Sequence, residues 1–423
     1  MNIKNNFFYT FEDVNALFQE KKYKDAKTLA LSILENDKDN LYVLNALALC
    51  YKNLGDTLKA KDIFIQLMNL NPKLDYIYSN AGNLFYAMGN INQAVICHQK
   101  SLKLNPKNVN SLHLIGLSLS DQGRDEEAIN YFKKCISVNT ANNSSYKSLG
   151  NSLRNLEKYK EASEAYEFST DRIAKCQQLE CLYLLGEKDI FYKKLSEFIK
   201  NYGPSPLAAT LSAHASVRYN EVDKYSFCKK PFEFIEKYEL LSTGIITQKI
   251  IDDFFKVFNN LKITKKTQTM LTNGYQSSGN IFLIDSPEIQ IIKKIIEDKI
   301  TFYRKKSNKD AAFISRWPKN YELYGWIITM ESGGKLSGHM HKEGWLSGSL
   351  YLERPKKHEK FDGDLAFSLH GSNYPRDGKT FDVKTINIEK GDMILFPSSL
   401  FHATIPFNSN TKRITLAFDI MPR

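Results

Sequence analysis

The chain has 423 residues, of which 42% are hydrophobic and 25% charged, a balance typical of water-soluble globular proteins with two or three domains. It lacks the run of about 18 apolar residues that a membrane helix needs, and its N-terminal segment lacks the apolar core of a secretion signal, so we expect a cytoplasmic protein without a membrane partner. The net charge of +11 comes mostly from basic residues scattered over 171–423, which argues against a nucleic-acid partner.

A period of 34 residues runs through the first 170 positions. Alanine holds the same place in five successive units, namely Ala26, Ala60, Ala94, Ala128 and Ala162. Five residues earlier stands a glycine in the three central units (Gly55, Gly89 and Gly123), with Lys21 and Glu157 in the outer two. A small residue recurs at Ala48, Gly82, Gly116 and Gly150, and a ring at Phe64, His98, Phe132 and Tyr166.

This spacing predicts helix pairs that stack on one another. The glycine suits the turn within each pair because it tolerates positive φ, and the small residue suits a close crossing of the two helices. Asn71-Pro72 and Asn105-Pro106 end two units, since proline cannot continue a helix. One pair cannot bury its apolar face alone, so the units stack into a solenoid. The pattern closely resembles the tetratricopeptide repeat.

The resemblance implies a concave face built by the first helix of each pair. In this register the face includes Asn83, His113, Asn151 and Arg154. Asn and basic residues at such places bind extended peptide backbone in tetratricopeptide proteins, so we expect a protein or peptide partner in this groove. The alternative is a solvated polar face that only packs against the next domain.

The pattern changes after residue 170. Residues 171–235 predict capping or linking helices, and two further helical patterns open the segment 236–423. From residue 320 short β-like runs follow, the first being YELYGWIITM, which we expect to end in a turn at Gly333 and Gly334. Helices followed by a run of strands favour a β-barrel or sandwich supported by helices.

Two histidine clusters carry the chemistry of this segment. The first is GHMHKEGWLSG, with His339, His341 and Glu343, and the second is FPSSLFHATIP, with His402. In an extended chain residues i and i+2 point to the same side, so either His339 with His341 or His341 with Glu343 can reach inward. Two ligands from one strand and one from a distant strand form a facial set that leaves coordination positions open.

The stretches GYQSSGN, GWIITMESGG, HMHKEGWLSGSLYL, GDMILFPSSLFHATIPF and KRITLAFD resemble the iron(II)/2-oxoglutarate oxygenases, in particular a subgroup fused to tetratricopeptide repeats. The resemblance implies Fe(II) as the metal and 2-oxoglutarate as co-substrate. It also implies that Arg413, eleven residues after His402, binds the far carboxylate of 2-oxoglutarate, assisted by Thr415 and Tyr351.

The chain departs from that family at one ligand. If His339 matches the first family histidine, His341 stands where Asp or Glu is usual, whereas starting from His341 gives a regular His-x-Glu with Glu343. We favour His339, His341 and His402 as the metal ligands and keep Glu343 as the alternative. Trp345, beside the cluster, is a candidate substrate contact.

These patterns together predict an α+β multidomain protein. A tetratricopeptide solenoid would span 1–170, capping or linking helices 171–235, and a double-stranded β-helix (jelly-roll or cupin-like) with supporting helices 236–423. The predicted function is an Fe(II)- and 2-oxoglutarate-dependent dioxygenase, a hydroxylase whose repeats recruit a protein or peptide substrate. The alternatives are an interaction adaptor with an inactive β domain, and an oxygenase acting on a small molecule.

Overall fold

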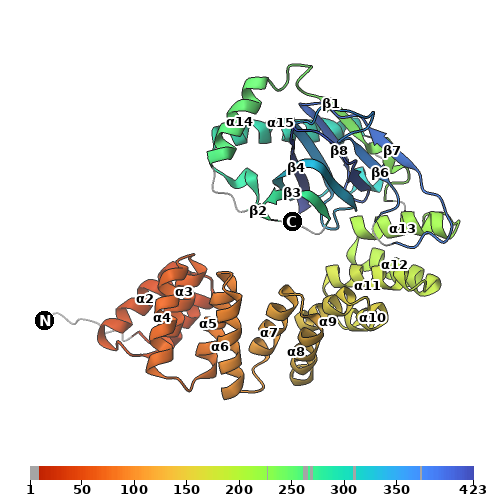
Figure 1. The fold of residues 1–423 in the computed structure, drawn as a ribbon. Coiled ribbons are helices and arrows are strands. Elements are labelled where there is room, and N and C mark those ends of the chain that lie inside the picture. Colours follow the sequence, from red (N-terminus) through yellow and green to blue (C-terminus); the bar gives the residue numbers. More distant parts are fainter. Residues whose placement is uncertain (1–8, 226, 261–264, 267–269, 308–310, 372–373) are drawn as a thin grey trace. The chain divides into compact units, whose positions relative to one another are not determined.

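The computed structural model describes residues 9–225, 227–260, 265–266, 270–307, 311–371 and 374–423. The chain divides into two compact units, Met1–Cys181 and Leu182–Arg423. The first unit is helical throughout its described residues, and the second combines helices with all the described strands (Figure 1). Helices α12 (Lys188–Tyr202) and α13 (Pro206–Arg218), which the sequence analysis put in the linking segment 171–235, group with the second unit.

The first unit is a row of helix pairs. Its helices are α1 (Phe11–Gln19), α2 (Tyr23–Asn36), α3 (Leu41–Asn53), α4 (Thr57–Leu70), α5 (Asp75–Ala87), α6 (Ile91–Leu104), α7 (Val109–Asp121), α8 (Asp125–Val138), α9 (Asn143–Asn155), α10 (Tyr159–Glu167) and α11 (Arg172–Leu184), which ends just inside the second unit. Asparagine or aspartate side chains accept from backbone N–H groups at the starts of α3, α4, α6, α7 and α9, which satisfies donors that a helix start leaves open.

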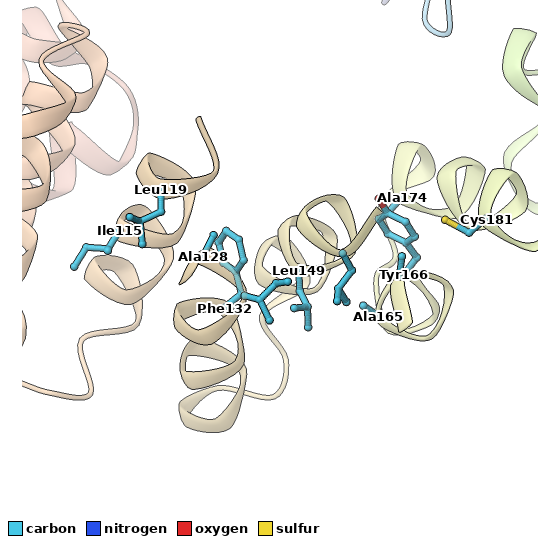
Figure 2. Close-up of a cluster of buried hydrophobic side chains, with 12 residues drawn as sticks. Ile115, Leu119, Ala128, Phe132, Leu149, Ala165, Tyr166, Ala174 and Cys181 are labelled. Atoms are coloured by element: carbon cyan, nitrogen blue, oxygen red, sulfur yellow. The ribbon is translucent and has the colours of Figure 1, made fainter. Parts of the chain in front are cut away.

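The 34-residue period has a steric cause. A Cβ placed on Gly116 would lie 2.5 Å from the Phe132 ring, and one on Gly150 would lie 2.4 Å from Tyr166. The small residue on the first helix therefore lets the ring of the second helix pack directly onto the backbone. Figure 2 shows these rings within one apolar cluster from Ile115 to Cys181, so the core is continuous from one pair to the next.

The turn positions adopt the left-handed conformation in every unit. Gly55, Gly89 and Gly123 have φ of 88°, 75° and 74°, and the two non-glycine residues at this place have φ of 61° (Lys21) and 58° (Glu157). The outer units thus keep the same turn without the residue that best tolerates it.

The second unit is built around one curled antiparallel sheet. Its strands are β1 (Glu236–Glu239), β2 (Lys265–Lys266), β3 (Leu271–Ser277), β4 (Tyr321–His339), β5 (Leu346–Glu353), β6 (Leu365–Ser368), β7 (Val383–Ile386), β8 (Asp392–Pro397), β9 (Phe401–Thr404) and β10 (Arg413–Pro422). They follow the order β1-β8-β5-β10-β4-β9-β6-β7, with β3 also paired to β4 and β2 to β3. The expected α+β architecture, helical repeats followed by a curled antiparallel β domain, is confirmed.

Strand β4 differs from the prediction. We expected it to end in a turn at Gly333 and Gly334, but it continues through both glycines to His339. Its first half pairs with β10 as far as Met330, and its last residues pair with β9 from Leu336 onward. One bent strand therefore joins the two halves of the sheet and carries His339 to the face where β9 holds His402.

The remaining helical segments of this unit are η1 (Pro231–Phe234), α14 (Gln248–Asn260), η2 (Ile281–Leu283), α15 (Pro287–Lys306) and α16 (Ala312–Ser315). Helix α15 buries one stripe of side chains at helical spacing, Ile289, Ile292, Ile296, Ile300 and Tyr303, whereas its opposite face is charged. Among the described residues, no helix combines the length and the apolar character that crossing a membrane requires.

Candidate metal centre

Three histidines meet inside the curled sheet. His339, the last residue of β4, is in register with His402 of β9, and His341 follows in the connection to β5. One ring nitrogen of each lies within 4.8 Å of the others. The predicted ligands from two distant segments are therefore neighbours in space.

The Nδ1 atom of each imidazole lies within hydrogen-bond distance of an oxygen atom. In His339 this atom lies 2.9 Å from the Ser337 carbonyl, in His402 3.3 Å from the Leu400 carbonyl, and in His341 2.7 and 2.8 Å from the two carboxylate oxygens of Asp419. Because these oxygens only accept, each Nδ1 carries the proton and each Nε2 keeps a free lone pair.

Two of these lone pairs face each other. The Nε2 atoms of His339 and His341 are 3.3 Å apart. Two acceptors at this distance repel unless a cation lies between or beside them, so the arrangement fits a metal ion held by Nε2 donors.

The environment keeps His339 and His402 neutral. Burial, reinforced by the neighbouring His341, lowers the pKa of His339 to about 4, and burial lowers the pKa of His402 well below its usual value of 6.5. Neutral imidazole is the form that binds metals, so no proton has to leave these two rings at neutral pH.

A cavity of about 570 Å³ adjoins the triad and runs along β10. Arg413, Thr415, Ala417 and Asp419 alternate along this strand and all line the cavity. The cavity therefore connects the histidines, near Asp419, with a buried guanidinium further along the same strand.

Arg413 has the features of an anion-binding residue. It is 3% exposed, its Nη1 donates to Thr415 Oγ1 at 2.9 Å and its Nε to the Gly363 carbonyl at 3.1 Å. No ion pair among the described residues includes it. The guanidinium carbon lies 4.9 Å from the centre of the Tyr351 ring, and the buried Tyr351 hydroxyl has no hydrogen-bond partner in the described part of the chain. A cation without a counter-ion beside an unpartnered hydroxyl fits a carboxylate.

Comparisons with known proteins agree with this geometry. The family described as "Putative 2OG-Fe(II) oxygenase" matches residues 324–419, a stretch that contains the triad and Arg413, and the tetratricopeptide repeat matches 41–74, 76–108 and 109–142. The chain carries tetratricopeptide repeats and a 2OG-Fe(II) oxygenase family domain.

The similarity to individual proteins is low or covers only part of the chain. The "Peroxisomal targeting signal receptor" of Kluyveromyces lactis is 29% identical over 103 residues, which are 24% of this chain and 18% of the receptor. The chain thus matches less than a fifth of that relative's length. Among solved structures, PilF of Pseudomonas aeruginosa has 15% identity and a TM-score of 0.42 over 47% of this chain and 92% of its own. PilW has 17% identity and a TM-score of 0.43 over 48% and 96%.

Two residues considered from the sequence, Glu343 and Trp345, lie outside the histidine triad. Glu343 is exposed and lines the cavity, but it does not belong to the group formed by the three histidines. Trp345, considered as a substrate contact, is 4% exposed and donates to the Phe313 carbonyl within an aromatic core. The tryptophan that lines the cavity is Trp326, whose ring centre is 5.7 Å from that of His341.

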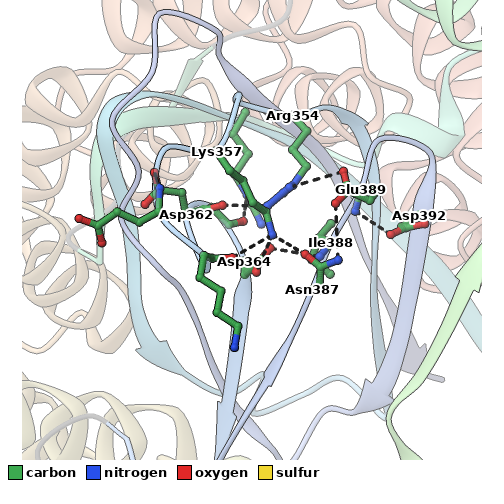
Figure 3. A network of polar contacts seen from close by, with 12 residues as sticks. Arg354, Lys357, Asp362, Asp364, Asn387, Ile388, Glu389 and Asp392 are labelled. Atoms are coloured by element: carbon green, nitrogen blue, oxygen red, sulfur yellow. Dashed lines mark hydrogen bonds and ion pairs between the residues drawn. The ribbon is translucent and has the colours of Figure 1, made fainter.

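A polar network that the sequence analysis missed supports the arginine end of the cavity (Figure 3). The buried carboxylate of Asp364 accepts from Arg354 at 2.6 Å, from Lys357 at 2.9 Å and from the Ile388 backbone at 3.1 Å. These contacts fix the loop whose Gly363 carbonyl accepts from Arg413. The available signal was the charged cluster between two apolar strands, which sequence alone does not distinguish from a solvated loop.

The predicted peptide-binding residues of the repeats contact neighbouring helices. Arg154 forms an ion pair with Glu180 at 3.1 Å, and His113 lies 2.9 Å from the Ser145 hydroxyl. Asn83 accepts from Asn110, and Asn151 accepts from the Tyr166 hydroxyl. A ligand in this groove would therefore compete with contacts that already join the repeats.

Proposed function

We propose that this protein is an Fe(II)- and 2-oxoglutarate-dependent dioxygenase, with the metal held by His339, His341 and His402. The observation that carries the proposal is the convergence of one ring nitrogen from each of three histidines whose Nδ1 atoms are hydrogen-bonded to oxygens. Three imidazoles would hold the metal and leave part of its coordination shell for a co-substrate. Bound Fe(II) would supply the coupling of 2-oxoglutarate decarboxylation to oxidation of a substrate C–H bond, here a hydroxylation.

Arg413 would hold the far carboxylate of 2-oxoglutarate. Thr415 fixes its guanidinium through the 2.9 Å hydrogen bond, and the unpartnered Tyr351 hydroxyl would donate to the same carboxylate. Apolar side chains of Ile328, Leu365 and Phe396 also line this cavity. They exclude water, which strengthens the pairing of Arg413 with an anion.

Turnover of the co-substrate tests this function. Purified protein with Fe(II), ascorbate and 2-oxoglutarate should form succinate, and the His402→Ala variant should not. A His402→Ala variant that retains both metal and turnover would overturn the proposed site. A fold control is the thermal unfolding midpoint of the variant in the absence of metal.

We also propose that the repeats recruit a protein or peptide substrate in the cytoplasm. The supporting observations are the three matched tetratricopeptide repeats and the similarity to a protein named as a targeting-signal receptor. Capture of peptides by the full chain should weaken when Asn83 and Asn151 are both replaced by alanine. Unchanged peptide capture together with turnover of a free small molecule would favour the small-molecule oxygenase.

A further inference from the structure

A buried carboxylate lies directly behind the histidine triad. Asp419 of β10 is 6% exposed, and its two oxygens lie 2.7 and 2.8 Å from Nδ1 of His341. The His341 ring separates this carboxylate from the point where the Nε2 atoms meet. Asp419 therefore contacts the triad without belonging to it.

Serines of two further segments hold this carboxylate, Ser347 directly and Ser398 through Ser347. Ser347 of β5 donates to Asp419 Oδ1 at 2.6 Å, and its hydroxyl lies 2.8 Å from that of Ser398, which follows β8. Because the Ser347 proton is directed to Asp419, Ser398 donates to Ser347. The His341 backbone N–H in turn donates to the Ser398 carbonyl at 3.1 Å. The carboxylate thus has two direct partners, Ser347 and His341, and Ser398 in turn holds both of these in place.

This carboxylate decides which nitrogen of His341 carries the proton. A carboxylate accepts and cannot donate, so Nδ1 must be the protonated atom and Nε2 must be the lone-pair donor. The other two histidines obtain the same tautomer from neutral backbone carbonyls, Ser337 and Leu400. Only the ring of His341 is backed by a negative charge.

We infer that Asp419 is a positioning residue for the metal centre, which fixes the His341 tautomer and supplies negative charge to the metal through that ring. The inference rests on the proposed function, since the metal concerned is the one held by the triad. Three neutral imidazoles leave a divalent ion with its full charge, whereas a carboxylate hydrogen-bonded to a ligating imidazole raises its basicity. In a His-x-Asp or His-x-Glu site the carboxylate would bind the metal directly. In this chain the carboxylate of Asp419 lies behind the ring of His341 and reaches the metal only through that ring.

The Asp419→Asn variant tests the inference because it keeps the shape and removes the charge. The Ser347 hydroxyl will keep the amide oxygen at the Oδ1 position, so the amide NH₂ takes the Oδ2 position, 2.8 Å from Nδ1 of His341. The negative charge is then lost, and Nδ1–H faces an N–H donor beside its remaining acceptor, which favours moving the proton to Nε2, where it competes with the metal. We expect the affinity of the full chain for Co(II), measured by calorimetry and by the visible absorption of bound Co(II), to fall about 10–100-fold.

Glu331→Gln is the matched control. Glu331 lies on β4, the strand that ends at His339, but it is exposed, is not among the residues that line the cavity, and pairs with Lys412 at 2.8 Å. A charge exposed to solvent is screened, so Co(II) affinity should remain that of the wild type. Equal losses in the two variants, or no loss in a folded Asp419→Asn variant, would overturn the inference.

A measurement on the wild type does not depend on the variant folding. In the metal-free chain, ¹⁵N NMR of the histidine side chains should show His341 as the Nδ1–H tautomer, and Asp419→Asn should shift it toward Nε2–H. A wild-type His341 in the Nε2–H form would contradict the inference. If the wild type instead shows the expected tautomer but binds no Co(II), the metal-site proposal fails while the role of Asp419 in setting the tautomer stands.

Discussion

Replacement of Arg413 by methionine separates co-substrate binding from metal binding. The guanidinium is buried, lacks a carboxylate partner among the described residues, and lies within the cavity but outside the triad. Truncating one partner of a buried, hydrogen-bonded charge pair costs about 2–5 kcal/mol, which corresponds to a loss of at least ~30-fold in 2-oxoglutarate affinity. The affinity for the metal should not change.

For the stability of the same variant without ligand, we expect no loss. Burial lowers the pKa of Arg413, because desolvation disfavours its charge. Methionine fills similar volume without this cost, so the variant without ligand should be at least as stable as the wild type. With Mn(II) present, 2-oxoglutarate at 100 times the wild-type Kd should raise the unfolding midpoint of the wild type by the equivalent of about 2.7 kcal/mol. At the same concentration a variant that binds at least ~30-fold more weakly should gain at most about 0.9 kcal/mol.

Thermal unfolding with and without 2-oxoglutarate measures both effects. Lys412→Met is the control, because Lys412 is the neighbouring residue on β10 but is exposed and paired with Glu331 at 2.8 Å. It should retain the full stabilisation by 2-oxoglutarate. Equal 2-oxoglutarate affinity in Arg413→Met and the wild type would refute the assignment of the arginine.

Three further substitutions test other parts of the structure. His339→Ala should lose bound Fe(II) in equilibrium dialysis while Glu343→Ala keeps it, and the reverse pattern would establish Glu343 as the ligand in place of His339. His98→Phe should make the free energy of unfolding less sensitive to acid. Burial lowers the pKa of His98 to about 4, so the wild type has its full stability above pH 6.5 and loses it as the pH falls toward 4. The loss at pH 5 is ~2 kcal/mol. Urea unfolding at pH 7.5 and pH 5 checks this, and an equal pH dependence in wild type and variant would contradict it. Glu157→Gly should stabilise the repeats by about 0.5–1 kcal/mol in the same assay, since its φ of 58° strains any residue with a Cβ; a lower midpoint would show that the turn gains nothing from glycine.

The repeats were predictable because their period has a local steric cause. A ring such as Phe132 requires a residue without a side chain at Gly116, and a short loop requires positive φ at Gly123. The small residue and the ring recur in four units and the positive φ in all five, so they appear in the sequence at a fixed interval. The identity of the partner has no such repetition, and the contacts of His113 and Arg154 with neighbouring helices became visible only in three dimensions.

In the oxygenase domain, side-chain types were easier to predict than their surroundings. The histidines stand out because histidine is scarce in this chain, and alternation along a strand placed His339 and His341 on one side. The strand β4 nevertheless ends at His339, and His341 reaches the triad from the connection to β5. Its orientation depends on a hydrogen bond rather than on the strand alone.

That hydrogen bond explains why the metal ligands could be predicted from the sequence but Asp419 could not. Asp419 lies 78 residues after His341 in a strand of apolar residues, KRITLAFDIMP. Its partner is decided by the register of β10 against β5, which pairs Asp419 with Ser347 and contains a bulge between Ile414 and Thr415. A shift of one residue would turn Asp419 to the opposite face of the sheet. A buried carboxylate at such a position is costly unless it is hydrogen-bonded, and in this domain its partners are Ser347 and His341. The stability of the sheet and the tautomer of the candidate metal ligand therefore depend on the same register.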